Sequence, residues 1–397
     1  MGKLNDNIRI FSNKTSKELM KLTANSLKEH SKGLFEKGIL NVSTKTFPSG
    51  EVYCKLPLNV RKKSVHLIAS FHSPDSFELK KSIVNSNLSQ KEKAKLIEDF
   101  IHTTERDFRE LEKICDAARR GGAAGISVYL PYFPDSRQEK KDVSGVPISA
   151  KLALDNIKAS TEPTLRRLAS AELHSPQIQG MTNYPLDEMQ VVYLFILHLK
   201  LFYSLNDVVL ILPDAGSYKR YQGLIKDFQL NYSIISKTRP EHGKSRAENY
   251  IGSSLKNKIA VIFDDIIDSG GTIINAAREA KDLGAKDVIV YATHGIFSTK
   301  IKRNENKEPE DFIFAEDKFE KEGLKVCISD SVPRTKEYRE LNSKWLVQFT
   351  LAPLIGELIY CNEKGKSHGE KIEKLKKLAL SDDKKEIKKE LDRFFIY

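Results

Sequence analysis

The stretch that most limits the possible folds of this chain runs from Ile259 to Ala292. An apolar run, Ile259 to Phe263, is followed by a polar loop and then by apolar residues at helical spacing from Ile273 to Leu283. Gly284 stands where such a helix would end, and a second apolar run begins at Val288. The pattern predicts a strand, a loop, a helix and a second strand, with the loop at the carboxyl end of the first strand.

The loop combines carboxylates, glycines and hydroxyls. Its polar and small residues are Asp264, Asp265, Asp268, Ser269, Gly270, Gly271 and Thr272. The glycines let the backbone approach an anion, and the unpaired N–H groups that open the helix favour a phosphate. The adjacent carboxylates suit sugar hydroxyls or Mg²⁺ instead. The loop therefore predicts a sugar-phosphate site, and an acidic turn without a ligand is the weaker alternative.

Length and composition narrow the class of protein. The 397 residues are enough for two domains. No apolar run reaches the roughly 18 residues of a membrane span, since Val191 to Leu205 is interrupted by His198 and Lys200. The N-terminal residues lack the apolar core of a signal peptide, so we expect a cytoplasmic protein. The 4 cysteines form no CxxC pair, which favours free thiols over zinc ligands or disulfides.

The formal net charge is +11 at pH 7. Such a charge is compatible with nucleic-acid binding, but the lysines are widely distributed and no nucleic-acid motif accompanies them. We therefore expect small anionic substrates, with neither nucleic acid nor membrane as a partner.

Short apolar runs alternate with helical patterns along most of the chain. Besides the two runs above, buried strands are predicted at Val65–Ala69, Ile126–Leu130 and Val208–Leu212. This alternation indicates an α/β fold with parallel sheets covered by helices. Ligands of such folds bind at the carboxyl ends of the strands, and Pro131–Phe133 and Pro213–Gly216 follow two of them.

Three segments look like additions to this core. Residues 82–107 are polar and helix-prone, with a helix start at Ser89–Glu92. Residues 302–322 are dense in charge, which predicts a surface loop or insertion. From Asn362 onward, narrow apolar stripes predict a helical hairpin whose second helix starts at Ser381–Asp383. We favour a solvated appendage for this tail over a surface for a partner.

Five further motifs occur in the chain before the loop at Asp264–Thr272, and together with this loop they indicate a protein family. They are Phe47–Glu51, Pro131–Asp142 (continued by Val146–Lys151), Ala171–Gly180, Leu212–Ser217 and Ser236–Pro240. Together they resemble the signature of ribose-phosphate pyrophosphokinases (PRPP synthetases), from about Ile8 to Tyr360. The loop alone is shared with type I phosphoribosyltransferases, which would not need the Arg137 loop, the His174 segment or a second α/β domain.

The resemblance implies a fold and a division of the chain. We expect two phosphoribosyltransferase-like domains, each a mostly parallel sheet covered by helices, plus a C-terminal helical extension. The first domain would span residues 1–168, with the inserted helical segment at about 82–107, and carry the ATP side. The second, residues 169–349, would carry the Mg²⁺ and ribose 5-phosphate side. Residues 350–397 would form a returning helix and the charged tail.

The resemblance also implies roles on the nucleotide side. Phe47 would stack on adenine and Glu51 would accept from its amino group, both reaching in from a neighbouring subunit. Ser49, where the family has Asp, would accept a bond without charge. Arg137 would bind phosphate oxygens with its guanidinium fork, and Gln138 would contact neutral groups of the nucleotide.

The metal and catalytic roles follow from the same resemblance. His174 and Asp214 would hold the Mg²⁺ that accompanies ATP. Lys237 and Arg239 would open a mobile catalytic loop, continued by the polar stretch 241–248, and act on the transferring group. Glu172, Ser217 and Thr238 are substitutions relative to the family pattern.

The implied reaction transfers the β,γ-diphosphate of ATP to the anomeric hydroxyl of ribose 5-phosphate, giving PRPP and AMP for nucleotide biosynthesis. Asp264 and Asp265 would hold ribose hydroxyls, and Asp268, Ser269, Gly270, Gly271 and Thr272 would bind the 5-phosphate. The family forms dimers that associate into hexamers, so we expect a homo-oligomer. Two alternatives are a catalytically silent regulatory homologue, which the substitutions favour, and a type I phosphoribosyltransferase.

Overall fold

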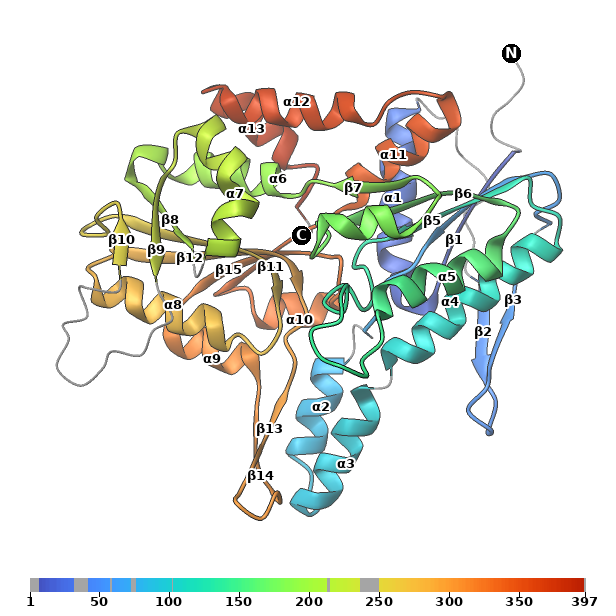
Figure 1. The fold of residues 1–397 in the computed structure, drawn as a ribbon, viewed down its shortest axis with the longest axis horizontal. Coiled ribbons are helices and arrows are strands. Elements are labelled where there is room, and N and C mark those ends of the chain that lie inside the picture. The colour runs from blue at the N-terminus through green and yellow to red at the C-terminus, as the bar shows by residue number, and fades with distance from the viewer. Residues whose placement is uncertain are drawn as a thin grey trace.

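The computed structural model describes residues 7–31, 42–57, 59–72, 76–101, 103–212, 215–235 and 250–395. These residues form two parallel or mostly parallel sheets covered by helices (Figure 1). The first sheet has the strand order β1-β4-β5-β6-β7, and the second has the order β10-β9-β8-β11-β12-β15-β16. The expected α/β class, with two such sheets and C-terminal helices, is confirmed.

The first sheet is built from strands and helices of the N-terminal half, and all of its neighbouring strands are parallel. Its strands are β1 Ile8–Ser12, β4 Ser64–Ile68, β5 Gly125–Leu130, β6 Leu165–Ala171 and β7 Leu186–Met189. Its helices are η2 Lys14–Ser16, α1 Lys17–His30, α4 Thr103–Arg120, α5 Ser149–Thr161 and η3 Pro176–Met181. A separate hairpin is formed by β2 Ser43–Thr46 and β3 Val52–Lys55. This sheet extends beyond residue 168, and the division into domains there stays a prediction.

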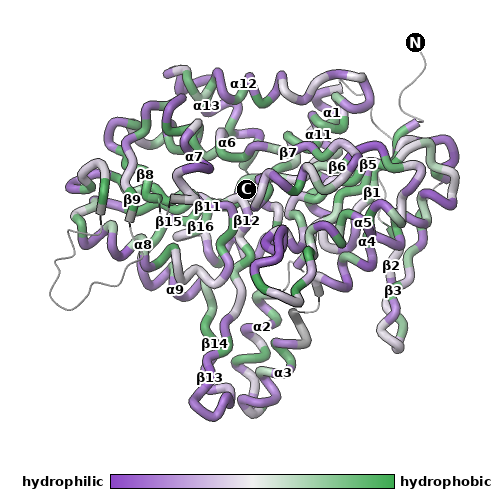
Figure 2. Tube along the Cα trace, viewed as in Figure 1, coloured by the Kyte–Doolittle hydropathy of each residue, from purple (hydrophilic) through white to green (hydrophobic). Residues whose placement is uncertain are grey.

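The second sheet is parallel except for its edge strand β10, which pairs antiparallel with β9. Its strands are β8 Val208–Leu212, β9 Asn231–Ile235, β10 Tyr250–Gly252, β11 Ile259–Ile267, β12 Asp287–Gly295, β15 Lys325–Ser329 and β16 Leu346–Phe349. Its helices are α6 Val192–Phe202, η4 Leu205–Asp207, α7 Ala215–Phe228, α8 Gly271–Asp282, α9 Ala315–Glu322 and α10 Lys336–Leu341. Figure 2 shows that the central strands of this sheet are hydrophobic, because helices cover both faces.

Successive side chains of a strand point to opposite faces of its sheet, so each sheet has a separate hydrophobic core on each face. On β11, Val261 and Phe263 join a core shared by both sheets, which also contains Ile10 and Tyr129 of the first sheet. Their neighbour Ile262 faces a second core under α8 and α9. The shared core therefore fixes the two sheets against each other by burying apolar surface from both.

The C-terminal helix α11, Ala352–Lys364, returns to pack against α1 of the first sheet. The two helices approach closely at Gly356, where an added Cβ would lie 3.3 Å from the backbone N of Leu27. Beyond it, His66 of β4 lies 3.0 Å from a carboxylate oxygen of Glu363. The last helices of the chain thus hold the first sheet as well as the second.

The addition expected at residues 82–107 covers the end of helix α2 (Ser76–Val84), helix α3 (Gln90–Ile101) and the start of α4, and it packs against the second expected addition. The helices α2 and α3 lie beside the hairpin of β13 Lys300–Arg303 and β14 Pro309–Ile313, and both project from the same side of the molecule (Figure 1). Lys91 and Glu308 form an ion pair of 2.8 Å between them. The predicted helix start is confirmed, because Ser89 and Glu92 exchange capping hydrogen bonds.

Residues 302–322, expected to form a surface loop or insertion, are not a loop. The first part is the ordered hairpin, and the second part is α9, whose Phe319 is fully buried. Phe77 of α2 lies in the same core and packs edge-on against Tyr338 with ring centroids 4.9 Å apart. The helical insertion of the N-terminal half therefore completes a core of the C-terminal half.

The C-terminal tail is also more firmly packed than expected. Its helices are α12 Gly369–Leu380 and α13 Lys384–Leu391, and Asp383 caps the second one as predicted. Leu375, Ile387 and Phe394 are buried in the shared core. The tail is therefore a covering layer over α6, and not a solvated appendage. Within the described part of the chain, no helix is long and apolar enough to cross a membrane.

Substitution of Phe77 tests whether the insertion completes this core. Phe77→Ala should lower the free energy of unfolding by about 3–5 kcal/mol, because it removes a buried ring and leaves a cavity. Leu79→Ala on the same helix is the matched control, since the Leu79 side chain is 43% exposed. Urea denaturation of both variants measures the difference, and equal stabilities would show that α2 does not contribute to the core.

Candidate active site

The predicted sugar-phosphate loop joins β11 to α8 at the carboxyl end of the second sheet. Gly270 precedes α8 with φ 73°, a left-handed conformation that favours glycine. An added Cβ there would lie 2.7 Å from Cζ of Phe319. Gly271 and Thr272 are exposed at the start of the helix, where backbone N–H groups lack partners within the helix. This geometry suits a phosphate above the loop.

The strand before this loop is longer than the apolar run predicts. β11 continues to Ile267, and Asp264 pairs in register with Ala292 of β12. The two adjacent carboxylates, Asp264 and Asp265, therefore lie on a paired strand and not in a free turn. The pairing fixes their backbone positions.

Asp265 is buried and held by two basic groups. Its Oδ2 lies 2.6 Å from Nδ1 of His174, and its Oδ1 lies 2.8 Å from Nη1 of Arg220. Arg220 also donates to the backbone carbonyl of His174. Burial disfavours the charged form, but the hydrogen bond from His174 and the charge of Arg220 outweigh burial and lower the pKa of Asp265. Asp265 is therefore a carboxylate at neutral pH.

The pKa of Asp264 shifts in the opposite direction from that of Asp265. Burial and the neighbouring charge of Asp265 raise its pKa to about 7. One of its oxygens accepts from the backbone N of Asp265 at 2.9 Å. The pair thus places one fixed negative charge beside a second carboxyl group that holds its proton more tightly than an exposed aspartate does.

His174 is oriented by this arrangement. Because Nδ1 faces Asp265, the ring presents Nε2 to the other side, where no described residue is a hydrogen-bond partner. A carboxylate that holds the far nitrogen of a metal-binding histidine is a common arrangement. The residues present therefore fit a Mg²⁺ that takes most of its ligands from water and phosphate. No group of three acidic, histidine or cysteine side chains that could hold a metal occurs among the described residues.

Arg137 of the predicted ATP loop reaches the sugar-phosphate loop. Its Nη1 lies 2.8 Å from Oδ2 of Asp268, although the two residues come from different sheets. Gln138 beside it is exposed, and its side-chain oxygen accepts from Ser149. The structure thus brings together Arg137, His174 and the loop from Asp264 to Thr272.

Three predicted nucleotide contacts lie elsewhere. Phe47, Ser49 and Glu51 are exposed at the tip of the β2–β3 hairpin, which projects from the body of the molecule (Figure 1). Ser49 donates to Glu51 at 2.8 Å. Within one chain they do not join the other predicted site residues. Their role as contacts lent to a neighbouring subunit stays a prediction.

Three other predicted residues lie outside the described part of the chain. They are Asp214, Lys237 and Arg239. Their roles rest on the sequence motifs and stay predictions.

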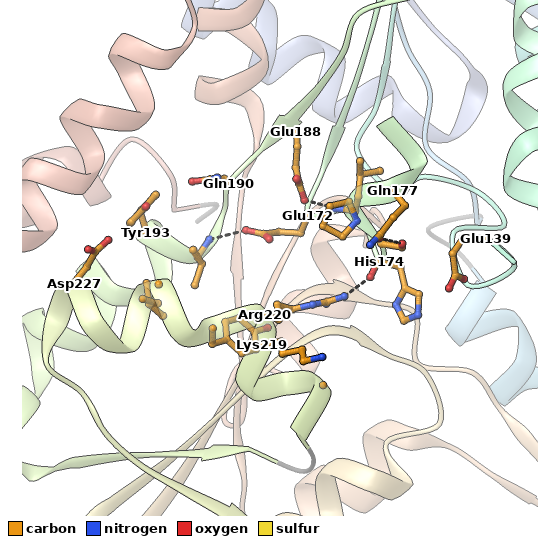
Figure 3. A pocket seen from close by; sticks show the side chains of 18 of the residues that line it. Glu139, Glu172, His174, Gln177, Glu188, Gln190, Tyr193, Lys219, Arg220 and Asp227 are labelled. Carbon is orange, nitrogen blue, oxygen red and sulfur yellow. Dashed lines mark hydrogen bonds between the residues drawn. The ribbon is translucent and has the colours of Figure 1, made fainter. Parts of the chain in front are cut away.

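A cavity of about 880 Å³ lies beside His174, between the ATP loop and helix α7 (Figure 3). Glu139 and Lys140 line it from one side, and Lys219 and Arg220 line it from the other. Figure 3 shows Arg220 extending from α7 toward His174. The cavity is polar and charged, as a site for an ionic substrate should be.

Sequence reasoning missed the part played by Arg220. The signal was present, because Lys219 and Arg220 closely follow the Leu212–Ser217 motif and lie in the second turn of α7. It also missed the role of Glu172, which the sequence analysis identifies only as a substitution. The Glu172 side chain accepts from the backbone N of Val191 and Val192 and so caps α6. Burial and the nearby Glu188 raise the pKa of Glu172 to about 7.

Comparisons with known proteins identify the family of this chain. Residues 8–160 match the N-terminal domain of ribose phosphate pyrophosphokinase, and residues 193–325 match the phosphoribosyl transferase domain. The ribose-phosphate pyrophosphokinase of Mycoplasma pneumoniae is 30% identical over 319 residues, which cover 79% of this chain and 82% of that protein. The chain belongs to the ribose-phosphate pyrophosphokinase family.

Other relatives support the assignment. The ribose-phosphate pyrophosphokinase of Rhodopirellula baltica is 31% identical over 314 residues, covering 79% of this chain and 84% of its own. The crystal structure of phosphoribosylpyrophosphate synthetase from Mycobacterium smegmatis superimposes with a TM-score of 0.68 at 24% identity. That superposition covers 91% of this chain and 100% of the other, and supports the fold with its two phosphoribosyltransferase-like units.

Gly270 offers a test of the loop geometry. Gly270→Ala should lower the free energy of unfolding by about 1–3 kcal/mol and weaken ribose 5-phosphate binding, because the new Cβ strains a left-handed residue and collides with Phe319. Gly323→Ala is the matched control, with φ 61° and no atom within 4 Å of the added Cβ. Thermal denaturation and titration calorimetry measure both effects. Equal losses in the two variants would mean that contact with Phe319 is unimportant.

Proposed function

We propose that this protein transfers the β,γ-diphosphate of ATP to ribose 5-phosphate, giving PRPP and AMP, with Mg²⁺ as cofactor. The observation that carries the proposal is the 2.8 Å contact between Arg137 and Asp268. It supports the proposal because the side chain expected to bind ATP phosphates lies directly beside the predicted sugar-phosphate loop. A phosphoribosyltransferase that only consumes PRPP would need no such donor loop.

The acceptor is held at the carboxyl end of β11. The N–H groups of Gly270, Gly271 and Thr272 bind the 5-phosphate at the start of α8. Asp264 and Asp265 accept hydrogen bonds from the ribose hydroxyls, and Asp265 remains ionised because His174 and Arg220 surround it. Fixing both ends of the sugar orients its anomeric hydroxyl toward the ATP side.

The donor is held by residues of both halves. Arg137 binds phosphate oxygens of ATP, and Gln138 contacts the nucleotide. His174, through Nε2, and Asp214 would hold Mg²⁺, which neutralises charge on the ATP phosphates. Lys237 and Arg239 close over the β-phosphate as negative charge develops there.

The reaction is a displacement at phosphorus. The anomeric oxygen forms a bond to the β-phosphorus of ATP and loses its proton. The bond between that phosphorus and the α,β-bridging oxygen breaks, and AMP leaves. The protein contributes alignment and positive charge and forms no covalent bond to the substrates.

The exposed aromatic residues of the hairpin β2–β3 support a proposal for adenine binding. Phe47 and Tyr53 are 40% and 41% exposed, and their rings meet edge-on with centroids 6.0 Å apart. We propose that this hairpin reaches a neighbouring subunit, where Phe47, Ser49 and Glu51 contact the nucleotide. The active protein would then be a homo-oligomer, built from dimers and reaching a hexamer as the family does.

The reaction can be tested directly. Purified protein, incubated with ATP, Mg²⁺ and ribose 5-phosphate, should release AMP, and release should stop when ethylenediaminetetraacetate removes the metal. AMP is detected by chromatography. Nucleotide binding without AMP release would favour the silent regulatory homologue. Consumption of PRPP with a nucleobase would favour the phosphoribosyltransferase.

Lys237 tests the catalytic assignment. Lys237→Ala should reduce kcat by about 10²–10³ while ribose 5-phosphate binding stays near normal, because its charge acts on the transferring group. Lys286→Ala, an exposed lysine away from the site, should leave turnover unchanged. Steady-state AMP release and calorimetry separate the two effects. Turnover of Lys237→Ala within a few-fold of wild type would remove Lys237 from the mechanism.

A further inference from the structure

The sugar-phosphate loop rests on helix α9. Lys318 of this helix donates from Nζ to the backbone carbonyl of Ser269 at 3.0 Å. The ring of the next residue, Phe319, lies under Gly270. Both contacts come from the same side of the loop, so α9 forms its floor.

The hydrogen bond from Lys318 sets the orientation of one peptide group. In a trans peptide, the carbonyl and the following N–H point in opposite directions. Because the carbonyl of Ser269 points down to Lys318, the N–H of Gly270 points away from α9. It therefore faces the open side of the loop, where the 5-phosphate is proposed to bind.

The ammonium group of Lys318 also carries a positive charge, which no carboxylate in the described part of the chain balances by an ion pair. It is half-buried, and among the described residues it has no acidic partner in an ion pair. The nearby charge is that of another lysine, Lys300. By contrast, the acid of the loop, Asp268, is already paired with Arg137. A cation without an acidic partner beside a helix start suits a doubly charged phosphate.

Helix α9 is held firmly enough to position this group. Glu316 accepts from the hydroxyl of Tyr338 at 3.0 Å, and Phe319 is fully buried. Lys81 of the inserted helix α2 forms an ion pair of 2.6 Å with Asp317. Residues on both sides of Lys318 are therefore anchored, one of them by the N-terminal half of the chain.

We propose that Lys318 is a positioning residue that confers affinity for the 5-phosphate of the sugar substrate. It fixes the Ser269–Gly270 peptide with the N–H toward the phosphate and adds a positive charge beneath it. The inference rests on the proposed function, since it assigns the phosphate of ribose 5-phosphate to this loop.

The test compares Lys318→Met with wild type in the full-length protein. The KM and the calorimetric Kd for ribose 5-phosphate should rise about ten-fold, as expected for loss of a charge-assisted hydrogen bond. The kcat and the KM for ATP should stay within about two-fold, since Lys318 touches neither reacting group. Lys318→Arg, which keeps the charge and a donor, should restore most of the affinity.

Two controls make the result specific. Lys321→Met, on the exposed side of the same helix, should leave ribose 5-phosphate affinity unchanged. Inorganic phosphate, used as a probe for the phosphate group alone, should bind Lys318→Met more weakly than wild type in calorimetry. Unchanged affinity for ribose 5-phosphate in Lys318→Met, or equal weakening of ribose 5-phosphate and ATP, would overturn the inference. Failure of the wild type to bind ribose 5-phosphate or release AMP would instead overturn the proposed function, and the inference with it.

Discussion

The site depends on burying two adjacent carboxylates on one strand. Ionised carboxylates that touch in a buried place repel each other, so one must be neutralised by cations or by a proton. Asp265 is held ionised by His174 and Arg220, and Asp264 responds with a raised pKa. The same contacts orient the His174 ring and draw helix α7 toward the first half of the chain. A single electrostatic requirement thus places the residues proposed to bind the sugar next to the residue proposed to bind the metal.

The second requirement is that two sheets keep a fixed separation. The shared core joins them on one side, and the insertion α2–α3 joins them on the other by placing Phe77 among the aromatic residues of the second half. Because α2 also contacts α9, and α9 lies under Gly270, the addition is continuous with the floor of the sugar-phosphate loop. Segments that look peripheral in the sequence therefore take part in holding the site.

Sequence patterns predicted the elements whose structure depends on neighbouring residues in the chain. The strand Ile259–Phe263, the glycine loop and the helix after it follow from periodicity and turn chemistry. The extension of β11 to Ile267 did not, because pairing with β12 overrides the polar character of Asp264 and Asp265. Arg220 was missed because its partner Asp265 is distant in sequence, and the charged stretch 302–322 hid a buried Phe319 for the same reason. Contacts between distant segments leave little trace in local composition.

The ion pair between the ATP loop and the sugar-phosphate loop links the binding of the two proposed substrates. The Arg137–Asp268 pair is partly exposed, so it contributes only about 0–1 kcal/mol and can be exchanged at low cost. Phosphate oxygens of ATP bind a guanidinium group more strongly than one carboxylate does, so ATP would take Arg137 from Asp268. Asp268 would then lie un-neutralised beside the 5-phosphate and repel it, which argues against the direct role in binding this phosphate that the family resemblance implies for Asp268. The proposed role of Lys318 resolves this conflict, because its cation lies beneath the loop and does not leave when Arg137 turns to the nucleotide.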